Sequence, residues 1–196
     1  SQKQALHPIA SAQKRAAWNP ATPIASKLDP MEKIYRLTVH HSAIYLRDTS
    51  LATCATQIKH IQRDHMNPDR GYADIGYHFL IDPAGRIWEG RDLRWQGAHA
   101  RGENNRGNIG ICLLGNFMKG REGQRPTSAQ LDSLRGLISD LSDHYGIAND
   151  QIHCHKDFVK TDCPGPLLAS QVEAIAQSLR SQPNPGRKSG IASLPQ

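Results

Sequence analysis

The sequence predicts a single mixed α/β domain with a central β-sheet flanked by helices. Short apolar runs of strand length alternate along the chain with longer segments whose apolar residues recur every three or four positions. Strands interleaved with helices usually form one sheet with helices packed against it. The chain has 196 residues, which is enough for one core but short for two full domains.

The first half of this domain is predicted to contain a strand, a helix and a hairpin. Residues 35–40 have the composition of a strand. Residues 49–66 have apolar positions near one face of a helix, and Asp, Thr and Ser residues suited to capping stand at its start. Residues 77–81 and 86–89 are predicted to pair as a hairpin, because the Asp-Pro-Ala-Gly segment 82–85 between them is typical of a turn.

The second half is predicted to contain two more strands and two more helices. Residues 108–114 are almost continuously apolar, which indicates a strand buried on both faces. The clearest helix begins at Thr127, whose spacing from Gln130 is that of a capping box. A short strand at 151–153 and a last helix over 167–180 complete the domain.

The two ends of the chain are predicted to lie outside this core. Residues 1–34 contain four prolines and lack sustained periodicity, so we expect an extension that packs on the domain. The domain itself is assigned to residues 35–180. Residues 181–196 are rich in Pro, Gly and Ser, which is typical of a flexible tail.

Charge and hydropathy exclude some classes of function. The formal net charge is +6, which favours anionic partners. However, the basic residues are scattered and no nucleic-acid recognition motif with interleaved aromatic residues is present, so we expect no nucleic-acid partner. We also expect no transmembrane segment, because no run of about 18 apolar residues occurs. The opening residues are polar and Met is not the first, so any export leader is expected to have been removed.

The chemistry-bearing residues with the most informative pattern are two histidines and a cysteine. His40 ends the first predicted strand, and His155 and Cys163 follow far downstream. Two imidazoles and a thiolate suit zinc, and catalytic zinc sites keep three protein ligands. His41 points to the opposite face of the strand from His40. His153 is a rival ligand on spacing alone.

The other three cysteines do not define a disulfide framework. Cys112 lies in the apolar run 108–114 and is expected to be a small core residue. If Cys163 binds a metal, an odd number of cysteines is left, so a full set of disulfides is not expected. One disulfide among Cys54, Cys112 and Cys154 stays open at this point.

An ordered set of short motifs resembles a known family. The motifs are Thr38–Ala43, Gly76–Phe79, Gly97–His99, Asn108–Ile111 and His155–Gly165. In this order and at these intervals, they are similar to the zinc amidases of the N-acetylmuramoyl-L-alanine amidase type 2 family, which includes phage lysozyme-type amidases and peptidoglycan recognition proteins. The likeness covers roughly residues 35–170. Lys14–Trp18 resembles the Arg–Trp segment that opens many recognition-protein domains.

The resemblance implies a metal centre with one Zn²⁺ per chain. Its ligands fall on His40, His155 and Cys163, and the catalytic tyrosine of the family falls on Tyr77. Thr161 is the second catalytic candidate: it stands where some phage relatives have a Lys, and recognition proteins with amidase activity often have Thr there, which offers a neutral donor instead of a charge. Recycling amidases carry a Glu in the strand that here holds Cys112, so the resemblance favours the tyrosine-using subgroup.

The resemblance also implies contacts with substrate. His99 and Asn105 match positions where the family holds the stem peptide of peptidoglycan. Trp95 and Arg101 flank them in a polar loop, and His41 is expected to line the groove from the other side of its strand. A loop of this kind can bind an acidic peptide through hydrogen bonds and charge pairing.

The function implied is hydrolysis of the amide bond between N-acetylmuramic acid and L-alanine, with peptidoglycan or a muropeptide as substrate. The alternative is a non-catalytic peptidoglycan receptor with the same fold, in which the cysteine ligand is typically lost. The expected location is periplasmic or secreted, or cytoplasmic for a phage-encoded lysin.

Overall fold

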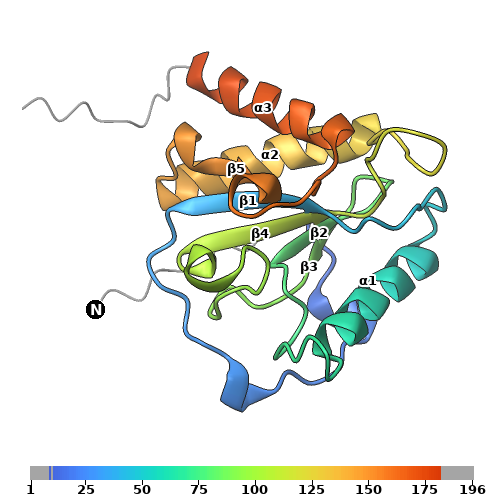
Figure 1. Cartoon of the computed structure of the whole chain (residues 1–196), viewed down its shortest axis with the longest axis vertical. Coiled ribbons are helices and arrows are strands. Elements are labelled where there is room, and N and C mark those ends of the chain that lie inside the picture. Colours follow the sequence, from blue (N-terminus) through green and yellow to red (C-terminus); the bar gives the residue numbers. More distant parts are fainter. Residues whose placement is uncertain (1–8, 10, 182–196) are drawn as a thin grey trace, which may run out of the picture.

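The computed structural model describes residues 9 and 11–181 of the chain and consists of one sheet with three long helices around it (Figure 1). The strands are β1 (Arg36–His41), β2 (Phe79–Ile81), β3 (Ile87–Glu89), β4 (Asn108–Leu113) and β5 (Ile152–Cys154). The α-helices are α1 (Leu51–Met66), α2 (Ser128–Tyr145) and α3 (Pro166–Ser181). Short 3-10 helices are η1 (Arg15–Trp18), η2 (Ala25–Lys27), η3 (Gly102–Asn105), η4 (Asn149–Gln151) and η5 (His155–Asp157).

The sheet is mixed, and its order is β3-β2-β4-β1-β5. β1 is parallel to both β4 and β5, and β2 is parallel to β4, whereas β3 is antiparallel to β2. The mixed α/β fold predicted from the sequence is therefore confirmed. β1 lies in the interior of the sheet, where its last residues, His40 and His41, pair with β4, whereas its pairing with β5 ends at Val39.

The helices cover the two faces of the sheet unequally. α2 and α3 pack on one face and α1 on the other (Figure 1). The larger apolar cluster joins α2 and α3 to Leu37 and Val39 of β1 and to Ile109 and Ile111 of β4. The smaller cluster joins α1 to the opposite face, where Cys112 lies.

Strand alternation on β1 separates the two adjacent histidines. Successive side chains of a strand point to opposite faces. Leu37 and Val39 belong to the core beneath α2 and α3, so His41 shares their face and His40 points to the α1 side. The core thus fixes which of the two imidazoles can take part in a site on the α1 side.

Most element boundaries differ from the sequence predictions by one or two residues, and three of these differences are informative. The regular ladder of β2 begins at Phe79 rather than at Tyr77, although His78 N–H still donates to Gly110 O at 2.9 Å. β5 covers Ile152–Cys154, one residue later than predicted. The first helix begins at Leu51, because Ser50 is its N-cap and accepts from the Thr53 N–H.

The predicted capping box is confirmed at the start of α2. The Thr127 hydroxyl accepts from Gln130 N–H at 3.0 Å, and the Gln130 side chain accepts from Thr127 N–H at 3.1 Å. This exchange satisfies two backbone donors that the first turn leaves without partners. The Gln130 amide also donates to Leu114 O at 3.0 Å, which joins the helix start to the segment after β4.

The N-terminal segment contacts the sheet edge and α1. Arg15 pairs with buried Asp74 at 2.9 Å, and the Trp18 indole N–H donates to Glu89 O at 2.8 Å. Trp18 is buried in the same cluster as α1. The tail predicted for 181–196 lies outside the described residues apart from Ser181, which ends α3. Within residues 9 and 11–181, no helix has the length and apolarity needed to span a membrane.

Candidate metal centre

Three side chains from distant parts of the sequence converge at the carboxyl end of β1. One ligand atom each from His40, His155 and Cys163 lies within 4.8 Å of the others. His40 is buried, whereas His155 and Cys163 are half-buried. The cluster therefore has a buried floor and a side that reaches solvent.

The parallel register of β1 and β5 explains how two of these residues meet. Val39 is opposite Cys154 in the ladder, so the next step along both strands brings His40 beside His155. Their ring centroids are 4.6 Å apart. The ladder itself ends at Cys154, and His155 opens η5.

Two hydrogen bonds hold the segment that carries Cys163. Lys156 N–H donates to Cys163 O at 3.0 Å, which ties the cysteine to the residue after His155. Cys163 N–H donates to the Thr161 hydroxyl at 3.2 Å. Thr161 thus lies next to the cluster and helps to fix the backbone at Cys163.

The spacing and chemistry of the donor atoms fit a zinc ion. His40 Nδ1 and Cys163 Sγ are 3.7 Å apart. Bonds of about 2.0–2.1 Å to nitrogen and about 2.3 Å to sulfur at a tetrahedral angle place the two donors about 3.6 Å apart. Two imidazoles and one sulfur are also the ligand types that zinc accepts in catalytic sites.

Burial controls the protonation of the cluster. It lowers the pKa of His40 well below its usual value, with the neighbouring His99 and His155 acting in the same direction. Burial likewise lowers the pKa of His155 and raises that of the Cys163 thiol to about 11. The imidazoles are therefore neutral at pH 7 and able to bind a cation, whereas Cys163 must lose a proton when it does so.

Tyr77 lies beside the cluster at the edge of the α1 side. Its ring centroid is 5.1 Å from that of His40, and the residue is half-buried. Burial raises the pKa of the Tyr77 hydroxyl well above its usual value, and the nearby Cys112 and Cys163 add to this shift. The hydroxyl therefore keeps its proton at neutral pH and can donate a hydrogen bond.

His99 and Asn105, which we predicted to contact substrate, lie close behind the cluster. The His99 ring is buried, and its Nδ1 is 3.0 Å from His40 Nε2. The Asn105 side-chain oxygen accepts from the backbone N–H groups of His99 and Ala100 at 2.9 and 2.8 Å. Both residues thus support the loop behind His40, and their contact with substrate stays a prediction.

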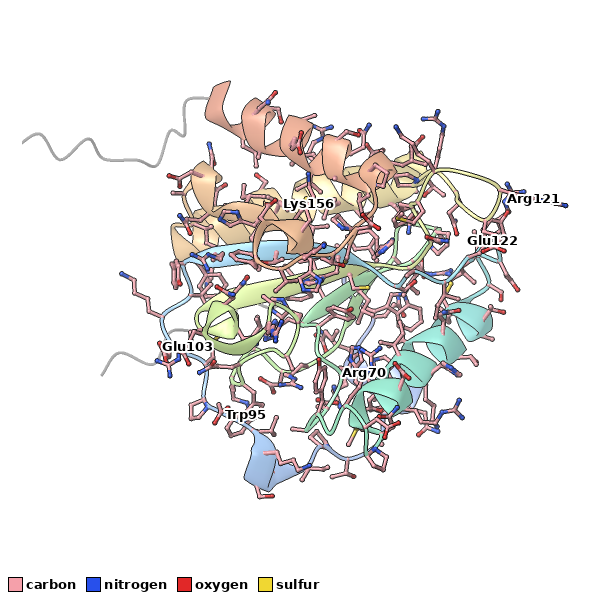
Figure 2. All side chains as sticks on the ribbon, in the orientation of Figure 1. Arg70, Trp95, Glu103, Arg121, Glu122 and Lys156 are labelled. Carbon is pink, nitrogen blue, oxygen red and sulfur yellow. The ribbon has the colours of Figure 1, made fainter. Side chains whose placement is uncertain are left out.

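The remaining residues predicted to contact substrate are less close to the cluster. His41 is buried on the opposite face of the sheet, where its Nδ1 accepts from Phe117 N–H at 3.3 Å, so its placement does not favour a role in lining the groove. Trp95 is well separated from Lys156, the neighbour of His155 (Figure 2). Arg101 is exposed at the start of η3. Substrate contacts of Trp95 and Arg101 stay predictions.

The rival ligand His153 and the remaining cysteines lie outside the cluster. His153 ring contacts are with Phe158 and Asp157, whose carboxylate lies 3.6 Å from its Nδ1, and it is outside the converging trio. Cys112 is fully buried opposite His40 in the ladder, as expected for a core thiol. Cys54, Cys112, Cys154 and Cys163 are all free, so the disulfide left open by the sequence does not form.

A polar cleft of about 720 Å³ opens beside the loop that carries His99. Its walls include Lys27, Glu32, Asn105 and Arg106. Charges of both signs therefore line this cleft, and none of the three cluster residues belongs to its walls. Such a cleft can hold an extended ligand that carries both carboxylates and amines.

Sequence reasoning missed the buried groups around His99. His78 accepts from Gly110 N–H at 3.0 Å through Nδ1, and its Nε2 lies 3.0 Å from Trp95 O. The His99 Nε2 lies 3.1 Å from Asn108 O. His78 and Asn108 both stand in the short motifs named above, which was a signal, but the order of those motifs does not indicate that these residues surround His99.

Comparison with known proteins identifies relatives named as amidases and relatives named as peptidoglycan-recognition proteins. The family described as N-acetylmuramoyl-L-alanine amidase matches residues 30–166. Peptidoglycan-recognition protein SC2 of Drosophila melanogaster is 38% identical over 135 residues, which are 68% of this chain and 70% of that protein. An N-acetylmuramoyl-L-alanine amidase of Sus scrofa is 32% identical over 168 residues, which are 84% of this chain but only 26% of that longer protein.

A solved structure supports the same assignment. Peptidoglycan recognition protein-LE in complex with tracheal cytotoxin, a monomeric diaminopimelic acid-type peptidoglycan, superposes with a TM-score of 0.74 at 28% identity. The likeness covers 85% of this chain and 94% of that one. The family match over residues 30–166 contains His40, His155 and Cys163. The chain therefore belongs to the N-acetylmuramoyl-L-alanine amidase family, in which amidases and peptidoglycan-recognition proteins share one fold.

Proposed function

We propose that this protein is a zinc-dependent amidase that cleaves the bond between N-acetylmuramic acid and the L-alanine of the stem peptide. The observation that carries the proposal is the convergence of His40, His155 and Cys163 within 4.8 Å beside Tyr77. Each of the three offers a donor of the type that zinc takes, and the half-buried side of the cluster leaves substrate a way in.

The residues of the site divide the work of amide hydrolysis. When bound, zinc lowers the pKa of a water ligand and polarises the scissile carbonyl. Tyr77, protonated at neutral pH, donates a hydrogen bond to the oxyanion that develops as the carbonyl is attacked. The Thr161 hydroxyl accepts from Cys163 N–H and so positions the cysteine. Thr161 also offers the reaction a neutral hydroxyl donor instead of a charged lysine side chain.

The second candidate function is a peptidoglycan receptor without catalysis. It is favoured by the recognition proteins among the relatives, one of them solved with a peptidoglycan fragment bound. Such a receptor needs the cleft but has no use for a thiol ligand. The intact trio and the adjacent Tyr77 favour the enzyme.

The experiment that separates the two functions uses a purified, defined muropeptide. Mass spectrometry of the products should identify a free stem peptide and a free lactyl carboxylate. Chelation should abolish this cleavage, as should Cys163→Ser. Cys154→Ser is the matched control, since Cys154 is a buried thiol outside the trio, and it should retain activity. Full cleavage by the chelated protein would refute the proposal, and binding without cleavage would favour the receptor.

The place of action follows the substrate. We propose the periplasm or the cell exterior, where peptidoglycan is exposed, or the cytoplasm of an infected cell in the case of a phage lysin. Fractionation of the producing cells, followed by detection of the protein with an antibody, tests this location.

A further inference from the structure

The buried ring of His99 stands directly behind His40. His99 Nδ1 lies 3.0 Å from His40 Nε2, and the two rings meet edge to face with centroids 5.0 Å apart. The other nitrogen of His40, Nδ1, is 3.7 Å from Cys163 Sγ. His40 therefore faces the ligand cluster with one nitrogen and His99 with the other.

The backbone carbonyl of Asn108 decides where the protons on this pair of rings lie. His99 Nε2 is 3.1 Å from Asn108 O, and a carbonyl oxygen can only accept. The Nε2 of His99 must therefore carry a hydrogen. A neutral imidazole carries only one, so His99 Nδ1 is an acceptor, and the hydrogen between the rings belongs to His40 Nε2.

The same logic leaves His40 Nδ1 without a hydrogen. The hydrogen on His40 Nε2 lies between the two rings, 3.0 Å from the accepting His99 Nδ1, and it is the one hydrogen that a neutral His40 ring carries. With its single hydrogen on Nε2, His40 presents a bare lone pair toward Cys163. The opposite tautomer would place a hydrogen on the nitrogen that has to bind metal, and it would set a lone pair of His99 against the Asn108 carbonyl.

Two glycines hold the His99 ring in this position. A Cβ at Gly110 of β4 would lie 2.5 Å from His99 Cδ2, and a Cβ at Gly97, in the loop just before His99, would overlap the same ring. Asn105 fixes the backbone of His99 by accepting from its N–H. The ring therefore fits closely against both glycine backbones and has little freedom to tilt.

The Asn108 carbonyl is fixed as well. The Asn108 side chain accepts from the Thr38 hydroxyl at 2.9 Å and donates to Asn104 O at 2.7 Å. Asn108 is fully buried and opens β4, next to β1. The acceptor that orients His99 thus belongs to the sheet that also positions His40.

We propose that His99 is a positioning residue that holds His40 in the tautomer with a bare Nδ1 and thereby prepares the first ligand for metal. The inference rests on the proposed zinc site. Ligating histidines usually donate their second N–H to an oxygen acceptor, and losing that partner typically weakens metal binding about 10- to 100-fold. Here the partner is a second imidazole, and the oxygen acceptor stands one residue further back.

Two substitutions of nearly equal shape isolate the acceptor. Asn and Leu both branch at Cγ, so His99→Asn and His99→Leu lose the same ring and leave similar space. Only Asn can place an oxygen near the position of His99 Nδ1 and accept from His40 Nε2. Differences between the two variants therefore report the hydrogen bond to His40 and cancel the cost of the lost packing.

The first readout is zinc affinity, measured by competition with a chromophoric chelator. His99→Leu should bind zinc about 10- to 100-fold more weakly than the parent protein, and His99→Asn should recover at least several-fold of that loss. His153→Asn, a change at a half-buried histidine outside the trio, should bind as tightly as the parent. Parent-like affinity in His99→Leu, or equal losses in the two His99 variants, would overturn the proposal.

The second readout is the tautomer of His40 in the metal-free protein, read from long-range ¹H–¹⁵N spectra of the imidazoles. The parent protein should have the hydrogen of His40 on Nε2, and His99→Leu should shift it toward Nδ1. A parent protein with the hydrogen on Nδ1 would refute the inference. This readout needs neither metal nor substrate, so a protein with the expected tautomer and tight zinc binding but no cleavage would contradict the proposed function alone.

Discussion

The histidines buried around the site should make the protein sensitive to mild acid, and His78 allows this to be measured one group at a time. Burial lowers the pKa of His78 to about 4, and the nearby Arg91 acts in the same direction, while the Trp95 carbonyl and Asp92 oppose the shift. In the unfolded chain the pKa is about 6.5. The unfolded state therefore binds a proton at pH values where the folded state does not.

The sign and size of the effect follow from this difference. A pKa that is lower in the folded state gives full stability above about pH 6.5, a loss as the pH falls toward 4, and no further loss below. Between pH 7 and pH 5, one such histidine removes about 2 kcal/mol from the free energy of unfolding. His41 and His65, whose pKa values burial also lowers to about 4, add similar losses.

The test compares the acid sensitivity of His78→Asn with that of the parent protein. The Asn oxygen can still accept from Gly110 N–H, which limits the structural cost. Urea unfolding of the metal-free proteins at pH 7 and pH 5 gives the loss for each, so the fixed cost of the substitution cancels. The variant should lose about 2 kcal/mol less than the parent.

A control on the outer surface completes this experiment. His60 is exposed on α1, so His60→Asn should lose as much stability between the two pH values as the parent protein. If His78→Asn instead loses as much as the parent, the buried ring does not drive the acid response and the reasoning from burial is refuted.

Three further outcomes are expected. Tyr77→Phe should lower kcat on a muropeptide by about 10²-fold or more with little change in KM, because it removes a donor to the oxyanion; an unchanged kcat would exclude Tyr77 from the reaction. Thr127→Ala should lower the free energy of unfolding by about 1 kcal/mol in urea titrations through the loss of the α2 cap, and a change below about 0.3 kcal/mol would contradict this. Gly110→Ala should weaken zinc binding in chelator competition, because the new Cβ meets the His99 ring; parent-like affinity would show that the ring is not held there.

The sequence was sufficient to predict the fold and the convergence of the three donors, for identifiable physical reasons. The alternation of side chains along the first strand predicted that His40 and His41 point to opposite faces of the sheet. The spacing of Thr127 and Gln130 predicted the start of a helix. The order of short motifs placed Cys163 near both histidines, although more than a hundred residues lie between His40 and Cys163. These features depend on local periodicity or on a resemblance that spans the domain.

The groups that position His40 could not be predicted from the sequence, because their contacts depend on tertiary geometry. Nothing in the order of residues says that the Asn108 carbonyl points at His99, or that His99 lies behind His40 instead of facing the cleft. His41 shows the same limit: alternation predicts that it faces away from His40, but only the packing of Phe117 reveals that this opposite side is buried. Residue types locate a site more easily than they assign roles within it.

The arrangement of the core explains why the fold should not depend on the metal. A structural zinc often supplies the folding free energy of a small domain that lacks a sufficient core. Here Leu37 and Val39 anchor β1 in a large apolar cluster with α2 and α3, and the first ligand follows directly on the same strand. The sheet that buries those side chains therefore also sets the direction of His40. Zinc would bind at a site that the folded sheet already forms. Removal of zinc should therefore abolish activity and the stability that zinc binding adds, while the sheet and its helices stay folded.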